Sequence, residues 1–281
     1  MTTRLALAML AATFGCDPQV QGDGGDDTTG GSGGIGSVIA EQFAHEGADV
    51  TIAARGQQAL DRTAAEIASR TGRNVRVALM DVTDAESIRA AVESVLAATG
   101  RLDAVVNSAV DVVGGAPGAP SELEASALGS ALDVKVLGAL RVIQAVTPPM
   151  RAMGYGRVIA IGGASSRQAG TTSAGVRNSA LTALCKNIAD ELGPNGITVN
   201  VIHPGGVLTA RNRARVESER ERGGGSFDEA EARLAASVPL RRMIHPEDIA
   251  PLALFLASPA AAAITGQTIA VDGGSTRAIT Y

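Results

Sequence analysis

The stretch Thr29-Gly-Gly-Ser-Gly-Gly-Ile-Gly36 is the part of the sequence that decides the fold. It is a glycine-rich turn, and an amphipathic helical pattern follows it through Phe43. A glycine turn that opens a helix lets backbone N–H groups and the helix dipole approach a pyrophosphate group. Such turns are common on their own, so this one gains its weight from the pattern that follows. The turn residues predicted to contact a bound dinucleotide are Thr29, Gly30, Ser32, Gly34, Ile35 and Gly36.

After the turn, short β-branched runs bounded by turn residues alternate with helical patterns. The stretch 85–98 is one such helix, and another carries Leu181 and Ile188 on one face and ends at Gly193-Pro194. This alternation predicts the α/β class: a Rossmann-like, doubly wound parallel sheet with helices on both faces, in one domain over residues 29–281. The predicted strands are 49–54, 75–80, 102–106, 157–161, 197–202 and 267–271.

The composition supports a large buried sheet and excludes several kinds of partner. Apolar residues make up 45% of the 281-residue chain and aromatic residues 2%, so the core must consist of Ala, Val, Leu and Ile. A net charge of −5 without a basic stripe argues against nucleic acid. The two cysteines indicate no disulfide framework, and no apolar run is long enough to span a bilayer. We predict no metal site.

Residues 1–28 precede this pattern and need a separate interpretation. Arg4, the apolar run 5–14 and Cys16 follow the order of a bacterial lipoprotein export signal in which Cys16 carries the lipid. Residues 17–28 then have the composition of a flexible acidic linker. The alternatives are a disordered or helical extension, or a segment that is not native to the domain. Membrane attachment is expected only if the export signal is real.

The end of the first predicted strand after the turn indicates which dinucleotide binds. A carboxylate there would bind a ribose 2′-hydroxyl and repel a 2′-phosphate, but the strand ends in Ala54-Arg55. A small residue beside an arginine suits the 2′-phosphate. The sequence therefore favours NADP(H) over NAD(H). The alternative is that Arg55 is an ordinary surface arginine.

These features together resemble the short-chain dehydrogenase/reductase family over residues 29–274. The turn matches the family's T-G-x-x-x-G-x-G pattern, and the segments 246–249, 255–259 and 264–267 are similar to its C-terminal part. The resemblance implies cofactor contacts from three further places: Asp81 and Val82 at the adenine, Asn107 and Ala109 beside the cofactor, and Pro204, Gly205, Val207 and Thr209 at the nicotinamide carboxamide. It also implies a homodimer or homotetramer, a cytoplasmic location, and hydride transfer between NAD(P)H and a small-molecule carbonyl or alcohol.

The resemblance fails at the residues that carry the family's chemistry, which are Ser, Tyr and Lys in an S…Y-x-x-x-K pattern. Counting back from Gly196 places Asn178 at the lysine, Ala174 at the tyrosine and Gly163 near the serine. The helper asparagine falls on Lys135. The chain's two tyrosines lie at positions 155 and 281, too far away to be slipped into place. General acid–base help is worth about 10²–10⁴ in rate, so its loss slows a reductase without forbidding it.

Five residues are candidates for a substitute active site, and each has a simpler alternative. Arg177 and Asn178 would polarise a carbonyl, or cap the start of their helix and pair on the surface. Lys135 would supply an ammonium group in the cleft, or be an exposed helix lysine. His203 would donate a proton, or be a strand-end histidine satisfied by hydrogen bonds. Ser165 lies in the expected loop, although loops are rich in serine anyway.

Two segments depart from the expected architecture. The residues before Thr29 cannot form a buried central strand, so we predict that the apolar run 5–14 replaces that strand or that the sheet is destabilised. The charged segment 211–237 interrupts the βα rhythm and is either a solvated surface excursion or a lid over the substrate, the interpretation we favour.

The sequence thus predicts an atypical NADP(H)-dependent oxidoreductase that acts on a carbonyl or an alcohol with non-standard catalytic residues. The alternative from another functional class is a non-catalytic NADP(H)-binding protein, which would use the same site as a sensor or scaffold. Both hypotheses require cofactor binding, and only turnover separates them.

Overall fold

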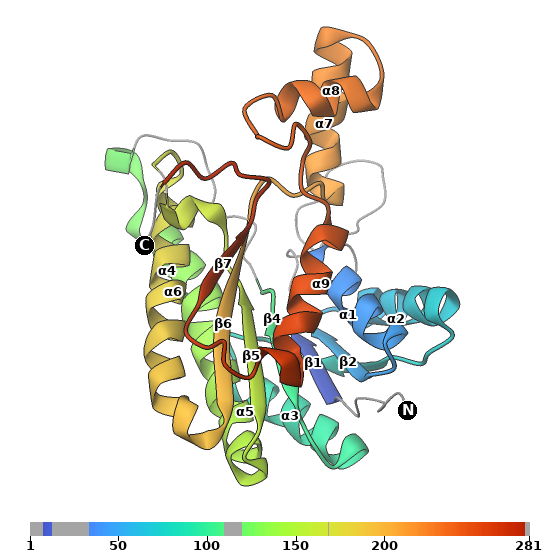
Figure 1. Cartoon of the computed structure of the whole chain (residues 1–281), viewed down its shortest axis with the longest axis vertical. Coiled ribbons are helices and arrows are strands. Elements are labelled where there is room, and N and C mark those ends of the chain that lie inside the picture. The colour runs from blue at the N-terminus through green and yellow to red at the C-terminus, as the bar shows by residue number, and fades with distance from the viewer. Residues whose placement is uncertain (1–7, 13–33, 110–119, 168, 279–281) are drawn as a thin grey trace.

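A parallel β-sheet forms the middle layer of the computed structural model, which describes residues 8–12, 34–109, 120–167 and 169–278. Neighbouring strands pair in the order β3-β2-β1-β4-β5-β6-β7 (Figure 1). The order reverses between β1 and β4, where open α/β sheets bind ligands at the carboxyl ends of their strands. The strands are β1 (Ala8–Ala12), β2 (Asp49–Ala54), β3 (Arg76–Leu79), β4 (Ala104–Asn107), β5 (Gly156–Ile161), β6 (Ile197–Pro204) and β7 (Thr268–Val271).

The central strand β1 comes from the apolar run near the N-terminus. It pairs in parallel with β2, Leu10 opposite Thr51, and with β4, Leu10 opposite Val105. This pairing agrees with the predicted replacement of the missing strand, because an unfilled gap would leave two unpaired backbone edges inside the sheet. The division of the chain at residue 28 therefore leaves a strand of the sheet outside the predicted domain. The rest of residues 1–28 lies outside the described residues.

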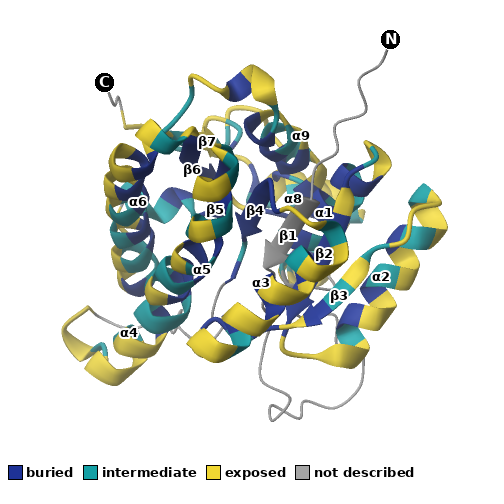
Figure 2. Ribbon diagram, turned by 90° about the horizontal axis from the view of Figure 1, so that it is seen from below, coloured by how far each residue is buried: buried dark blue, intermediate teal, exposed yellow. Residues whose placement is uncertain are grey.

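Helices cover both faces of the sheet, as predicted for a doubly wound fold. On one face α1, α2 and α9 pack through an apolar cluster that includes Ile39, Leu60 and Leu256. On the other face α3, α5 and α6 pack through a second cluster, with Ile88 and Val146 fully buried. The helix surfaces turned toward the sheet are buried and those turned away are exposed (Figure 2). Each fully buried aliphatic side chain contributes about 1.5–3 kcal/mol, so these two clusters hold the layers together.

The helix boundaries follow from local chemistry. Asp84 caps α3, its carboxylate accepting a hydrogen bond from the backbone N–H of Glu86. Gly100 ends the same helix in the left-handed conformation, with φ 69°. The helices are α1 (Ile35–His45), α2 (Gln57–Thr71), α3 (Ala85–Thr99), α4 (Ala125–Leu132), α5 (Gly138–Met153), α6 (Thr172–Leu192), α7 (Ala210–Gly223), α8 (Phe227–Leu234) and α9 (Pro246–Ala257). A π-helical turn, η2 (Asp133–Leu137), joins α4 to α5, and short 3₁₀ turns include η1 (Pro120–Glu122) and η3 (Ala164–Arg167).

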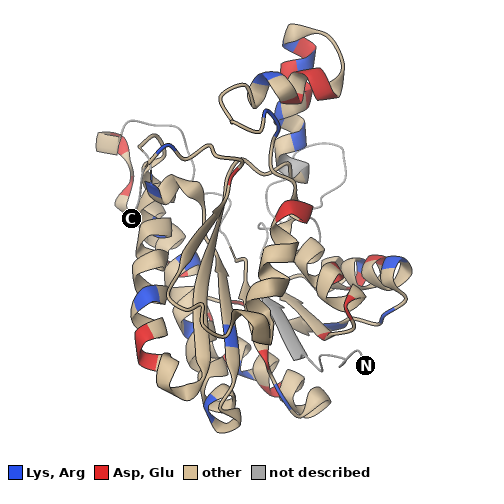
Figure 3. Ribbon diagram, in the orientation of Figure 1, with Lys and Arg blue, Asp and Glu red and all other residues tan. Residues whose placement is uncertain are grey.

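The charged segment 211–237 forms a helical hairpin. Helices α7 and α8 project beyond the carboxyl edge of the sheet (Figure 1). They have a small apolar cluster of their own, in which Val216 and Ala230 are fully buried against Met243. Charges of both signs are interspersed on their surface (Figure 3). A hairpin with its own core can move as a unit, and its action as a lid stays a prediction.

Candidate functional site

The glycine turn leads into the N-terminus of α1, which begins at Ile35. Gly34 is the N-cap residue, no side chain caps its helix end, and the first turn of α1 holds no acidic residue. Backbone N–H groups at such an end are available to an anion, and the helix dipole favours negative charge there. Gly36, in the first turn of α1, is buried. Thr29, Gly30 and Ser32 lie outside the described residues.

Arg55 lies directly after β2, at the carboxyl edge of the sheet. β2 is the neighbour of β1 on the side away from β4. The Arg55 side chain is exposed, whereas Ala54 before it is buried. The position therefore faces solvent and carries no carboxylate. These donors fit a dinucleotide with a 2′-phosphate: uncapped N–H groups at α1 suit the pyrophosphate, and a guanidinium suits the phosphate on the ribose.

Contacts within the protein hold the two segments that are predicted to lie at the adenine and beside the cofactor. The Asp81 carboxylate accepts hydrogen bonds from the backbone N–H and hydroxyl of Thr83, so it braces its own turn. Val82 is buried against α5, where a side chain on Gly138 would collide with it. The buried Asn107 side chain accepts a hydrogen bond from the N–H of Ala109. These contacts hold the turn after β3 and the residues directly after β4 in place.

The segment after β6 is also held by contacts within the protein. Gly205 N–H donates to the carbonyl of Val271 at the end of β7, and a Cβ at Gly205 would meet the Cα of Asp272 at 2.9 Å. Pro204 ends β6, Val207 is buried, and Thr209 is the extended N-cap of α7. The four residues predicted here therefore form one extended path from the sheet edge into the hairpin.

Lys135 is buried at the carboxyl ends of β4 and β5. It lies in the π-helical turn η2 and is 4% exposed. Its Nζ donates to the carbonyl of Ala109 at 3.1 Å and to the carbonyl of Ile161 at 2.5 Å. The alternative of an exposed helix lysine does not fit this burial. π-helical turns are rare and frequently occur at functional sites, so this position is the best supported of the five candidates.

Burial, together with the nearby positive charge of Arg177, lowers the pKa of Lys135 to about 7. A neutral amine has two N–H donors, which match the two carbonyls that Lys135 contacts. An ammonium group has a third N–H, and this is the proton it can transfer. Lys135 can thus hold or release a proton near neutral pH without losing its two hydrogen bonds.

This lowered pKa predicts how stability depends on pH. Between about pH 7 and the ordinary lysine value, the unfolded chain binds a proton that the folded protein does not, so the Lys135 contribution to stability rises with pH across that window. Below pH 7 the full cost of burying the charge remains. We expect Lys135→Met to raise the free energy of unfolding by roughly 1–3 kcal/mol more at pH 6 than at pH 9. Chemical denaturation at the two pH values measures this, with Lys186→Met, an exposed lysine of α6, as the control. A pH-independent difference would refute it.

Asn178 occupies space that a serine at position 163 would need. Its Nδ2 donates to the hydroxyl of Ser165 at 3.0 Å, and a Cβ on Gly163 would lie 2.7 Å from that same nitrogen. Asn178 is 5% exposed and its Oδ1 has no hydrogen-bond partner among the described residues. The loop and helix residues are therefore matched to each other: glycine at 163 makes room for the amide at 178. Ser165 also lines an open groove of about 720 Å³ beside the start of α6.

Arg177 lies one residue before Asn178, near the buried Lys135, whose pKa its charge helps to lower. Arg177 and Lys135 thus bring two basic side chains to the same end of the sheet. Ala174 lies one turn earlier on α6 and is partly buried. The structure brings Lys135, Ser165, Arg177 and Asn178 into one region.

His203 is also brought there, but as part of the framework. It is fully buried at the end of β6, and burial lowers its pKa. Its Nδ1 donates to the carbonyl of Gly163 at 2.5 Å and lies 2.9 Å from the Ser166 hydroxyl. Its Nε2 lies 3.0 Å from the Thr182 hydroxyl. Both ring nitrogens thus have protein partners, a geometry that favours the alternative of a satisfied strand-end histidine.

Sequence reasoning missed Ser166 and Thr182 as partners of His203. The sequence does place Thr182 near Asn178, because it lies four residues later on the same helix face, and its hydroxyl donates to the Asn178 carbonyl. The contact between Thr182 and His203 could not be predicted from the sequence, since only packing brings these residues of α6 and β6 together.

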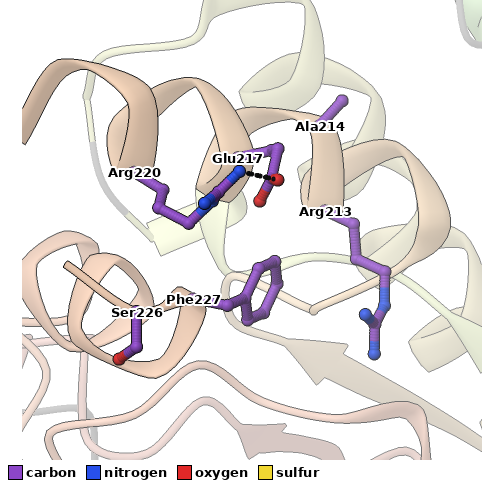
Figure 4. Close-up of a pocket in the computed structure, with 6 residues that line it drawn as sticks. All are labelled: Arg213, Ala214, Glu217, Arg220, Ser226 and Phe227. Carbon is purple, nitrogen blue, oxygen red and sulfur yellow. Dashed lines mark hydrogen bonds and ion pairs between the residues drawn. The ribbon is translucent and has the colours of Figure 1, made fainter. Parts of the chain in front are cut away.

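A second hollow lies between α7 and α8, away from these residues. It measures about 670 Å³, and its lining is mixed in charge (Figure 4). Arg220 pairs with Glu217 at 2.6 Å, and the Arg213 guanidinium lies 5.3 Å from the ring centroid of Phe227. The contact between Arg213 and Phe227 joins α7 to α8, whereas the pair of Arg220 and Glu217 lies within α7.

The described residues offer neither a cluster of metal ligands nor a membrane-spanning helix. They contain no group of three or more His, Cys, Asp or Glu side chains arranged to hold a metal ion. They also contain no helix that is both long enough and apolar enough to cross a membrane.

The chain is similar in sequence to known reductases. Residues 30–276 match a family model described as enoyl-(acyl carrier protein) reductase. The chain is 35% identical over 252 residues to the short-chain reductase protein NovJ of Streptomyces niveus, covering 88% of this chain and 91% of that protein. It is 30% identical over 253 residues to the NADPH-dependent reductase BacG of Bacillus subtilis, covering 89% and 96%.

The structure is also similar to that of L-sorbose reductase from Gluconobacter frateurii complexed with NADPH and L-sorbose. The TM-score is 0.83 at 27% sequence identity, and the match covers 98% of each chain. The predicted preference for NADP(H) agrees with relatives whose descriptions specify NADPH.

Proposed function

Because this chain belongs to the short-chain dehydrogenase/reductase family, we propose that it is an NADPH-dependent oxidoreductase that reduces a carbonyl group of a small molecule. The proposal rests on the burial of the Lys135 amine, which has a pKa of about 7 and lies at the carboxyl ends of β4 and β5. A reductase of this family needs a proton-holding group in that region. Lys135 is the described residue whose chemistry suits the task best.

The chain's own residues divide the work as follows. The N–H groups at the start of α1 and the Arg55 guanidinium bind the phosphates, and the turns at Val82 and Asn107 orient the rest of the cofactor. Bound NADPH supplies the hydride that adds to the carbonyl carbon. The carbonyl oxygen then takes up a proton, which the Lys135 ammonium donates. The resulting amine keeps its hydrogen bonds to the carbonyls of Ala109 and Ile161, so the group is ready to be reprotonated.

A non-catalytic NADP(H)-binding protein is the second candidate. It is favoured by Ala174, which carries no phenol, and by His203, whose ring nitrogens both have protein partners. One experiment separates the two. The purified protein is titrated with NADPH and NADH by cofactor fluorescence, then incubated with a panel of aldehydes and ketones and NADPH deuterated at C4. Deuterium in a product alcohol supports the reductase, tight NADPH binding without transfer supports the second candidate, and no binding of either cofactor refutes both.

Arg55 is the residue we propose for recognition of the 2′-phosphate. Charge-assisted hydrogen bonds are worth about 1.5–3 kcal/mol, so Arg55→Asp should weaken NADPH binding by roughly 10- to 100-fold and leave NADH binding nearly unchanged. Fluorescence titration of both cofactors measures this. Arg62→Asp, which makes the same change at an exposed position of α2, is the matched control. Equal loss of both cofactors in Arg55→Asp would contradict the assignment.

The remaining proposals concern location and assembly. Strand β1 lies within residues 1–16, so removal of that segment as an export signal would also remove the central strand. This favours a protein that works in the cytoplasm with the segment retained. A homodimer or homotetramer is proposed from the family resemblance, and light scattering of the full chain tests it.

A further inference from the structure

The connection between β1 and α1 is much longer than the fold requires. β1 ends at Ala12 and α1 begins at Ile35, whereas βα connections usually have about 2–6 residues. The intervening residues 17–28 are mostly Gly, Asp, Gln and Thr, a composition typical of a linker. A short loop would restrict where β1 can lie, and a connection of this length restricts it less. The contacts of the sheet itself must therefore hold β1.

Those contacts amount to a binding site for an extended peptide. β2 and β4 are each paired on their far sides, with β3 and β5, and both turn a second backbone edge toward β1. The register pairs residues 8–12 with residues 49–53 of β2, and residues 9–12 with residues 104–107 of β4. An occupant of this slot satisfies backbone donors and acceptors on both sides, which a strand at a sheet edge cannot do.

The walls of the slot define the chemistry of the occupant. Helix α1 packs over β1 on one face of the sheet and α3 on the other. The neighbouring strands contribute apolar residues to both clusters: Ile52 and Val106 to the first, Ala53 and Val105 to the second. The slot therefore accepts a parallel strand of small and aliphatic residues on both faces, and the sequence Ala-Met-Leu-Ala-Ala of β1 has that composition.

We propose that the slot between β2 and β4 is a peptide-binding site, and that the N-terminal segment of this chain is its exchangeable ligand. A peptide of residues 1–16, supplied separately, can then take the place of β1 after the linker is cut. In the intact chain the tether keeps the segment at a high effective concentration, so its own β1 normally occupies the slot. Exchange of an identical element between molecules needs no new contact, since the same contacts form in either case.

Slot occupancy is coupled to the nucleotide site, a consequence that rests on the proposed function. β1 lies beside β4 at the reversal of strand order, and the start of α1 faces the same carboxyl edge. A ligand that needs this edge formed will bind better when the slot is filled. By linkage, NADPH must then strengthen the binding of the strand in the slot. We expect this gain in affinity to appear as slower release of the strand.

The test uses the full chain with a specific protease site substituted into residues 19–25. After cleavage, an isotopically labelled synthetic peptide of residues 1–16, with Cys16→Ser, is added, and native mass spectrometry follows its incorporation. We expect the cleaved protein to retain its own fragment, to exchange it for the labelled peptide, and to do so at least threefold more slowly with saturating NADPH. A peptide with Leu10→Pro is the matched control and should not be incorporated.

Two outcomes would overturn the proposal. The cleaved protein can lose its fragment and remain folded with unchanged NADPH affinity, in which case the slot needs no strand. It can instead unfold even with excess peptide, in which case β1 depends on its covalent connection. Failure of the uncut protein to bind NADPH refutes the proposed function alone, because mass spectrometry still reads peptide exchange without cofactor.

Discussion

Leu10→Pro is expected to destabilise the protein more than any other single substitution considered above. Leu10 is the middle residue of β1 and has a neighbouring strand on each side, so its N–H lies within a ladder whichever neighbour it bonds. Proline removes that N–H and is almost never accommodated in a central strand. We expect a loss of about 3 kcal/mol or more of unfolding free energy, together with loss of NADPH binding.

Thermal and denaturant unfolding followed by circular dichroism measure the first effect, and fluorescence titration the second. Val20→Pro, in the segment between β1 and α1, is the matched control and should leave both unchanged. A Leu10→Pro protein as stable as the unmodified chain would mean that β1 is not the central strand, and that the sheet tolerates the gap the sequence implies.

Lys135→Met is expected to have the largest effect on turnover. Methionine fills a similar volume without a transferable proton, so kcat for carbonyl reduction should fall by about 10²–10⁴ while NADPH affinity changes little. The pH profile gives a second readout. Donation requires the ammonium form, which predominates below pH 7, so the rate of the unmodified enzyme should decline as pH rises through about 7.

The controls separate chemistry from packing. Lys186→Met, the same change at an exposed position, should retain the full rate and the full pH dependence. The chain has only these two lysines, so in a ¹³Cε-lysine spectrum the resonance missing from Lys135→Met identifies Lys135 and its titration can be followed directly. A Lys135→Met enzyme with an unchanged rate and the same decline near pH 7 would assign the proton to another group.

The strands and helices that sequence patterns predicted best are those with the strongest local signals. β2 was predicted over residues 49–54 and has those bounds, and α3, predicted over 85–98, spans Ala85–Thr99. Asp84 and Gly100 explain why the bounds of α3 could be predicted. Asp84 caps its start and Gly100 caps its end, and both signals are local in the sequence. The hairpin of α7 and α8 was harder, because its charged, glycine-containing sequence resembles a surface loop until its two helices pack together.

The candidate site shows the same division. The roles of Arg55 and of the glycine-rich stretch 29–36 were inferred from their neighbours in sequence, and they stay predictions. The burial of Lys135 could not be predicted, because its partners, the carbonyls of Ala109 and Ile161, are each 26 residues away in the chain. Likewise Gly163 and Asn178 look in the sequence like two separate losses. Only the structure shows that they fit each other, because a Cβ on Gly163 would lie 2.7 Å from the Asn178 Nδ2.

The sequence by itself determined the class of this protein, because alternating β and α segments dictate a doubly wound sheet. The glycine-rich stretch before α1 adds the prediction of a site for phosphates. These are local properties, set by side-chain period and backbone freedom. Only the tertiary structure decided which segment fills the centre of the sheet and which lysine is buried. Both depend on desolvation and pairing between residues far apart in the chain, and those energies exist only once the layers have closed.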